Sequence, residues 1–316
     1  MTLTEDRSEG LTVTISSYRP TMRTPEAGST QHPTWSSAGI ELIRRLDLPL
    51  AARGPASYQR EFVERYVPGE SCLMQQGEAE EIYRLCRMQE PHADVDAHGV
   101  FAQLLVEVAW NSPRLEGNRY SLEAARGLLN GGAIRCDVDT VMLLNHRSAI
   151  EFLVDLVRKE GLSSGFVRNL NAILMQDLVP DSGSLGAIRK GPLGIAGTLY
   201  SPLQEPDVIE AMLDSIVEKA ARIENPVEAA LFLWIQLAYL QPFESGNELT
   251  SRLAANIPLV LNNCAPLTFQ DVTRNDYARA MLAVYELRDA TLAAELLSWT
   301  YQRSTTNGAA ARGTGG

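Results

Sequence analysis

Residues 241–252, which read QPFESGNELTSR, decide the fold, because they describe a short loop between two helices. A strongly apolar segment precedes this loop, and apolar residues recur at helical spacing after it. Gly246 can adopt backbone angles that other residues avoid, which permits a tight turn before the second helix. The unpaired amides and the dipole at the start of a helix favour an anion. The stretch therefore predicts a phosphate-binding loop.

Helical patterning extends over most of the chain from residue 95 onward. An asparagine cap at Asn225, proline at Pro226 in the first turn and glutamate at Glu228 predict the start of an apolar helix that ends near Leu240. Further segments repeat apolar residues at intervals of three and four. The sequence therefore predicts a mainly α fold.

One segment, residues 186–202, has strand character instead. Its glycines and prolines stand at turn spacing with apolar residues between them, which predicts a short β-hairpin. An isolated hairpin is only marginally stable, so we expect it to lie on the helical core.

The chain divides into four predicted regions. Residues 1–35 are polar and turn-rich and are predicted to be disordered, and the tail at 304–316 is predicted to be disordered for the same reason. Residues 36–94 form a small helical N-terminal region, either as a subdomain or as packing around the main core. Residues 95–303 form the main domain.

Composition excludes several classes of function. The chain has 316 residues, of which 45% are hydrophobic, and a formal net charge of −11 at pH 7. This acidity argues against sequence-independent binding to nucleic acid, which needs clustered basic residues. No apolar stretch reaches the ~20 residues of a membrane span, and we expect a cytoplasmic protein. The four cysteines lack metal-binding spacing and are expected to be buried, reduced thiols: Cys72, Cys86, Cys136 and Cys264.

Two motifs in order carry a resemblance to a known family. Residues 241–252 resemble the Fic (Fido) signature His-Pro-Phe-Asp/Glu-x-Gly-Asn-Gly-Arg-x-x-Arg, and residues 112–118 (SPRLEGN) resemble the Fic inhibitory motif Ser/Thr-x-x-x-Glu-Gly/Asn. The resemblance covers roughly residues 95–303 and implies a Fido-type helical core. It also implies ATP and Mg²⁺ as cofactors, and transfer of AMP to a hydroxyl of a target protein aligned by a flap at residues 186–202.

The family roles carry over to five positions. The resemblance implies that Glu244 holds the metal and that Gly246 and Asn247 form the anion hole. It further implies that Arg252 is the second arginine of the signature and that Glu116 is the inhibitory glutamate that pairs with it.

Three positions depart from the signature. Gln241 replaces the histidine that removes a proton from the attacking hydroxyl, and an amide can orient a hydroxyl but cannot take its proton. Glu248 replaces a glycine, and Leu249 replaces the first arginine. The spacing of Ser245 and Glu248 fits a capping box, which would turn the carboxylate back onto the head of the helix.

These features leave three functions open. The first is a nucleotidyltransferase with weakened or altered catalysis, in which Gln241 orients the acceptor hydroxyl. The second is a phosphodiester hydrolase that removes AMP from proteins, with Glu116 activating water. The third is a catalytically inactive module that still binds an extended protein segment. A structural helix without any ligand remains an alternative reading of the loop, and homo-oligomerisation is left open.

Overall fold

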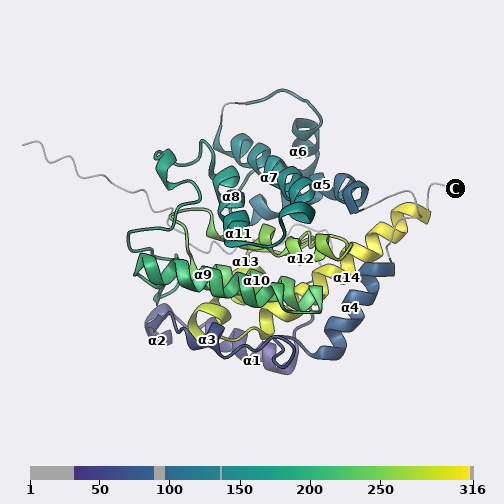
Figure 1. The fold of residues 1–316 in the computed structure, drawn as a ribbon. Coiled ribbons are helices and arrows are strands. Elements are labelled where there is room, and N and C mark those ends of the chain that lie inside the picture. The colour runs from purple at the N-terminus through teal and green to yellow at the C-terminus, as the bar shows by residue number, and fades with distance from the viewer. Residues whose placement is uncertain (1–31, 89–96, 136, 314–316) are drawn as a thin grey trace, which may run out of the picture.

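The computed structural model describes residues 32–88, 97–135 and 137–313, and the described residues are mainly helical, as predicted (Figure 1). The N-terminal elements are α1 (Ser37–Leu46), α2 (Leu50–Arg53), β1 (Ala56–Ser57), α3 (Glu61–Glu64) and α4 (Gln76–Met88). Next come α5 (Ala97–Leu115), α6 (Leu122–Leu129), α7 (Val138–Glu160), α8 (Ser164–Met175), the short 3₁₀ turn η1 (Ser182–Ser184), β2 (Tyr200–Ser201) and α9 (Pro206–Ala221). The C-terminal elements are α10 (Pro226–Leu240), α11 (Asn247–Ala254), α12 (Asn256–Leu261), α13 (Arg274–Leu282), the π-helical turn η2 (Ala283–Leu287) and α14 (Thr291–Gly313).

The centre of the fold is α10, and all of its residues are buried. The Asn225 side chain accepts hydrogen bonds from the amides of Val227 and Glu228, and Pro226 occupies the first turn, so the predicted start of this helix is confirmed. Because its surface is apolar on all sides, α10 must be surrounded. It packs against α4, α9, α11, α12, α14 and η2.

Two groups of helices enclose α10. Helices α5 to α8 form one layer, which lies above α10 in Figure 1, and α8 and α5 contact α11 from that side. On the other side lie α1 to α3 (Figure 1), where α1 contacts α13 and α14 and β1 contacts η2. The loop between α10 and α11 therefore lies where the two layers meet.

The N-terminal region shares the core of the main domain. Buried side chains such as Tyr58, Val63 and Ile82 belong to the same hydrophobic cluster as Trp234 and Leu240 of α10. Of the two options that the sequence left open, the structure thus favours packing around the main core. The predicted disordered segment at residues 1–35 falls almost wholly outside the described residues.

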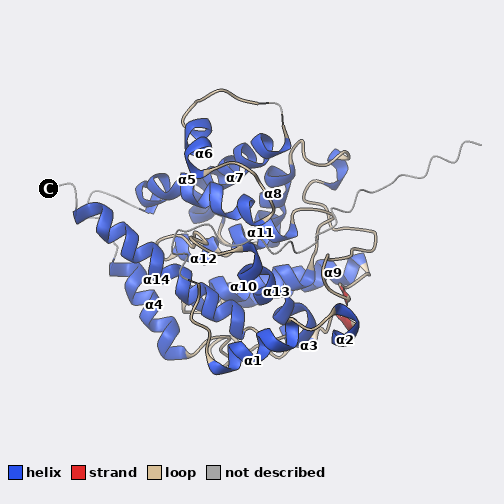
Figure 2. Ribbon diagram, turned by 180° about the vertical axis from the view of Figure 1, so that it is seen from behind, coloured by secondary structure: helices blue, strands red, loops and turns tan. Residues whose placement is uncertain are grey.

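The predicted β-hairpin at residues 186–202 is wrong. The strand β2 within this segment pairs in parallel with β1 from the N-terminal region (Figure 2, red), and Ile188 forms an antiparallel bridge with Phe243. Arg189 explains this arrangement, because its buried guanidinium donates to the carbonyls of Gln241 and Leu203 and so ties the segment to the core. The segment is an extended flap whose strand-pairing partners, β1 and Phe243, lie elsewhere in the chain.

The expectation of separate buried thiols also needs correction. Cys86 of α4 and Cys264, after α12, form a disulfide with a Cα–Cα distance of 5.1 Å, and Cys72 is exposed. These two cysteines are 178 residues apart, and only the packing of α4 against the core brings them together. Cys136 lies outside the described residues.

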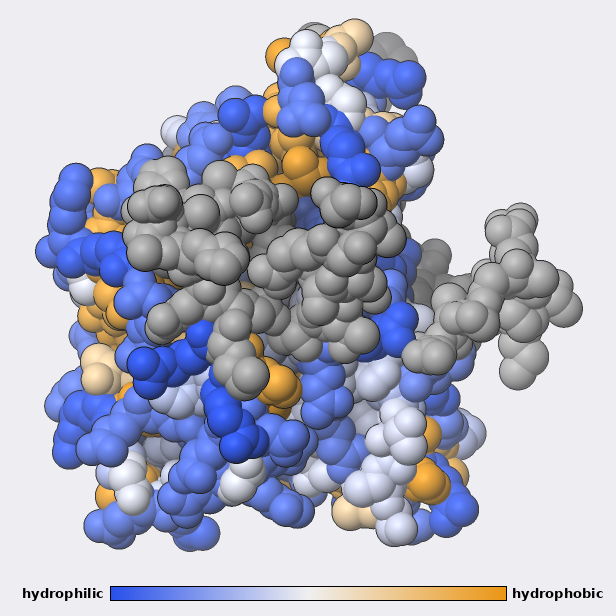
Figure 3. Space-filling view, turned by 90° about the vertical axis from the view of Figure 1, so that its right-hand side faces the viewer, coloured by the Kyte–Doolittle hydropathy of each residue, from blue (hydrophilic) through white to orange (hydrophobic). Residues whose placement is uncertain are grey.

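At the C-terminal end, α14 continues to Gly313, whereas the sequence predicted a disordered tail from residue 304. The alanines at 309–311 favour a helix and extend this one. None of the helices in the described ranges has both the length and the hydropathy needed to cross a bilayer. On the face shown in Figure 3, hydrophobic residues form separate small groups among hydrophilic ones.

Candidate functional site

The site begins at the loop that joins α10 to α11. The last turn of α10 ends at Gln241, whose φ of 52° places it in the left-handed region and reverses the chain. Phe243 is buried in the core, and the Asn247 side chain both accepts from its amide and donates to its carbonyl, each at 2.8 Å. Asn171 of α8 adds a bond to the carbonyl of Ser245 at 2.9 Å. The loop is therefore held rigidly from both sides.

Gly246 is the residue that this turn requires. Its φ is 75°, and an added Cβ would lie 2.6 Å from Sδ of Met175. A side chain at this position would therefore be strained and would also collide with α8. Among the described residues, no acceptor forms a hydrogen bond with the backbone N–H groups of residues 246–249 at the head of α11. These amides are a suitable place for an anion.

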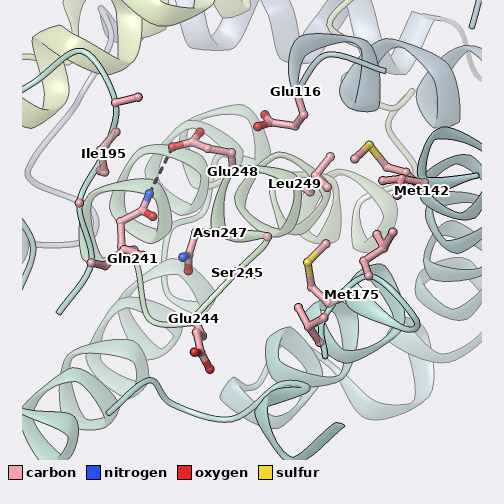
Figure 4. Close-up of a pocket in the computed structure, with 17 residues that line it drawn as sticks. Glu116, Met142, Met175, Ile195, Gln241, Glu244, Ser245, Asn247, Glu248 and Leu249 are labelled. Carbon is pink, nitrogen blue, oxygen red and sulfur yellow. Dashed lines mark hydrogen bonds between the residues drawn. The ribbon is translucent and has the colours of Figure 1, made fainter. Parts of the chain in front are cut away.

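Gln241 points inward and its amide nitrogen is already engaged. Nε2 donates to Oε1 of Glu248 at 3.2 Å (Figure 4), and also to the carbonyl of Ala238 at 2.8 Å and to the Tyr285 hydroxyl at 3.3 Å. The side chain is 5% exposed. It can orient its neighbours, but it offers no basic group to the pocket.

The capping box predicted for Ser245 and Glu248 is absent. The residue that caps α11 is Gly246, and the Glu248 carboxylate turns away from the amides toward two tyrosines, because these supply stronger donors. The Tyr277 hydroxyl donates to Oε2 at 2.5 Å, and the Tyr285 hydroxyl donates to Oε1. Burial, followed by the nearby charge of Glu116, raises the pKa of Glu248. The head of the helix is left open.

Arg252 lies deeper, on the second turn of α11, with 1% of its side chain exposed. Nη2 pairs with Oε1 of Glu116 at 2.7 Å, so the structure brings together the two residues that the sequence paired. Nε donates to the Ser112 hydroxyl at 2.8 Å, and Nη1 lies 3.9 Å from Oε2 of Glu248. The guanidinium also stacks over Tyr277, at 4.8 Å from the ring centroid. Its charge is thus shared between two carboxylates.

A cavity of about 590 Å³ opens in front of these residues (Figure 4). Its charged lining consists of three carboxylates, Glu116, Glu244 and Glu248, and its apolar wall includes Met142 and Met175. The described lining contains no lysine or arginine, and Leu249 stands where the signature has an arginine. The N-terminal end of α11, with its free amides, forms the floor of the cavity. The charged side chains that line the cavity are all negative.

Glu244 is the one carboxylate of the three that has no hydrogen bond or ion pair among the described residues. It is exposed, and Figure 4 shows it on the side of the loop away from Glu116 and Glu248. No group of three or more His, Cys, Asp or Glu side chains in the described ranges is arranged to hold a metal. A single free carboxylate fits Mg²⁺ only together with phosphate oxygens.

Sequence reasoning missed several residues that shape the site. Tyr277 and Tyr285 hold Glu248, Met175 closes over Gly246, and Arg189 fixes the flap. Arg189 had a visible signal, because an arginine between glycines in an apolar segment needs acceptors. Tyr277 and Tyr285 carried no such signal, because their spacing is typical of any amphipathic helix.

Comparisons with known proteins agree with this geometry. The family model for the Fic/DOC family matches residues 161–259. A Fic-1 fragment from C. elegans has a similar structure, with a TM-score of 0.63, 18% identity, and coverage of 76% of this chain and 73% of that chain. A Fic domain containing signaling protein from Bacteroides thetaiotaomicron gives a TM-score of 0.59 at 21% identity, covering 72% and 94% of the two chains.

A third solved structure, of a Fic family protein from Desulfovibrio desulfuricans, gives a TM-score of 0.55 at 18% identity and covers 89% of this chain and 77% of that chain. No curated protein matches in sequence. The resemblance to the Fic family is confirmed, and the match to the family model includes the loop at residues 241–252 but not the segment at residues 112–118. The chain has the Fic fold, and residues 161–259 match the Fic/DOC family model.

Proposed function

We propose that this chain binds ATP with Mg²⁺ at the head of α11 and transfers AMP slowly to a hydroxyl of a target protein. Fic-family domains are associated with AMP transfer or a related modification, which supports the reaction class. The open amides of residues 246–249 support a phosphate subsite. Glu244 would hold Mg²⁺, which would neutralise part of the phosphate charge. The flap at residues 186–202 would border the target segment.

The environment of Gln241 is the reason to expect a slow reaction. In AMP transfer the acceptor oxygen attacks the α-phosphorus, pyrophosphate leaves, and the hydroxyl proton needs an acceptor. The Gln241 amide cannot take this proton, and its nitrogen already donates to Ala238, Glu248 and Tyr285. Loss of a general base typically costs ~10²- to 10⁴-fold in rate.

The test is Mg²⁺-dependent transfer of label from α-labelled ATP to protein, measured in the Glu116→Gly background to relieve the ion pair with Arg252. We expect faint labelling in this background, and Gln241→His should raise it by about 10². Gln76→His, on the exposed start of α4, is the matched control and should change nothing. Absence of labelling in all of these variants would contradict the proposal.

One observation favours a second candidate, the catalytically inactive binding module. The side chains that charge the cavity are all acidic, so a triphosphate gains attraction only from backbone amides. This candidate predicts that ATP with MgCl₂ produces no thermal shift in any variant, while a protein partner still binds. Saturable ATP binding at millimolar concentration or below would exclude it.

A further inference from the structure

We propose that Glu248 is a second inhibitory carboxylate, which acts with Glu116 to keep the Arg252 guanidinium from reaching an anion in the pocket. The inference rests on the proposed nucleotide site and goes beyond it, because it assigns a role to a residue that departs from the Fic signature. It follows from the contacts of each nitrogen of one buried guanidinium.

The guanidinium of Arg252 has little capacity left for a ligand. Nε donates to the Ser112 hydroxyl, and Nη2 donates both to the Ser112 carbonyl at 3.1 Å and to Glu116. Nη1 is buried and has no hydrogen-bond partner in the part of the chain that the structure describes. The Glu248 carboxylate lies 3.9 Å from Nη1. Nη1 is therefore the nitrogen that an anion would have to reach, and Glu248 already lies beside it.

The Glu248 carboxylate is held in this position by its neighbours. Tyr277 and Tyr285 donate to its two oxygens, and Gln241 adds a third donor at 3.2 Å. Tyr277 also stacks on Arg252, so the same ring fixes both charges. A negative group held by three donors does not swing aside at little cost when a phosphate approaches.

Different structural elements carry the two carboxylates. Glu116 lies at the end of α5 and its side chain is 32% exposed, so a displacement of that helix end would remove it. Glu248 lies on α11 itself, four residues before Arg252, and travels with it. Removing Glu116 alone therefore leaves the guanidinium neutralised.

The experiment is a calorimetric titration of four forms of the full chain: wild type, Glu116→Gln, Glu248→Gln and the double variant. The probes are ATP with MgCl₂ and inorganic pyrophosphate, which needs no nucleoside contacts. Each single substitution should tighten binding by less than about 3-fold, whereas the double variant should bind at least about 30-fold more tightly, within the usual range of coupling between sites. Glu218→Gln, an exposed glutamate of α9, controls for the loss of one charge and should have no effect.

Circular dichroism and melting temperature establish that each variant is folded, and Glu248→Ala replaces Glu248→Gln if the amide variant is not. If Glu116→Gln alone gives the whole gain, the inference is overturned. The same holds if wild type already binds ATP tightly, although the proposed nucleotide site then stands. Tighter pyrophosphate binding without ATP binding supports the inhibitory pair and contradicts the nucleotide proposal. If neither probe binds any variant, both proposals fail.

Discussion

Two anion-binding elements of the site lie within seven residues of each other, and they differ in whether their donors are free to bind a ligand. The main-chain element, the amides of residues 246–249, is open. The side-chain element, the guanidinium of Arg252, is neutralised by Glu116 and Glu248. The turn and the helix fix the backbone amides, so most side-chain substitutions leave these amides in place. The guanidinium depends on its neighbours, because one nearby carboxylate such as Glu248 offsets its positive charge. In this chain, a loop that presents free amides therefore lies beside a pocket whose charged side chains are all acidic.

The largest expected effect comes from removing the cation. Arg252→Met should destabilise the protein by about 3 kcal/mol, because Glu116 and Glu248 would lose the charge between them. Urea unfolding followed by circular dichroism measures the change. Arg222→Met, at an exposed arginine 4.0 Å from Glu218, should cost less than about 0.5 kcal/mol. A cost below about 1 kcal/mol for Arg252→Met would show that the side-chain element does not tie the two carboxylates together.

The main-chain element is probed by Gly246→Ala. We expect a loss of about 2 kcal/mol, because alanine is strained at a φ of 75° and its Cβ would meet Met175. Gly127→Ala in α6 is the control, since nothing lies within 4 Å of the added carbon and helix propensity should raise stability by up to about 1 kcal/mol. Equal stability of Gly246→Ala and wild type would mean that the turn is looser than described.

The pH dependence of stability tests how enclosed the surroundings of Arg252 and His146 are. Burial, followed by the charge of Arg252, lowers the pKa of His146 to about 3 from its usual 6.5, and neither ring nitrogen has a partner in the described structure. A histidine with a depressed pKa stabilises the fold above pH 6.5, and this stability is lost as the pH falls toward 3. Between pH 7.5 and 5, wild type should lose about 2 kcal/mol relative to His146→Leu.

Parallel urea titrations at the two pH values measure this difference. His32→Leu serves as the control, because His32 is largely exposed. Equal losses in wild type and His146→Leu would indicate that His146 is solvated and that the guanidinium element is less enclosed than the structure shows.

The smallest effect is expected for Ser112→Ala. The hydroxyl accepts from Nε of Arg252 at 2.8 Å in a buried site, so its loss should cost about 1 kcal/mol of unfolding free energy. Ser201→Ala, on the exposed side of β2, should stay within about 0.5 kcal/mol of wild type. If both changes are equally mild, the hydroxyl contributes little to orienting the guanidinium.

The sequence was sufficient to predict the local features of the site. The cap at Asn225, the mainly helical core and the turn at Gly246 depend on residues close together in the chain, where propensity and spacing act. The proximity of Glu116 and Arg252 came from the motif resemblance, not from any local rule. The position of the amides at residues 246–249 was therefore predictable from the local sequence.

Features that depend on distant packing were not predictable. Glu248 was expected to cap its own helix, because its capping-box spacing from Ser245 is a local signal. It accepts instead from Tyr277 and Tyr285, which lie 29 and 37 residues away in the chain. The same reason accounts for the Cys86–Cys264 disulfide and for the pairing of β2 with β1 in place of a hairpin. Tertiary contacts overrode a plausible local pattern in each case.

The most direct test of the contrast between the two elements is a ¹⁵N–¹H NMR titration of the wild-type chain with ATP and MgCl₂, following the backbone amides of residues 246–249 and the Nε–H of Arg252. We predict saturable shifts of the backbone amides with no shift of the arginine signal, because Ser112 and the two carboxylates retain the guanidinium. A shift of the arginine signal at the lowest ATP concentrations, or amides that stay unchanged to saturation, would contradict this account.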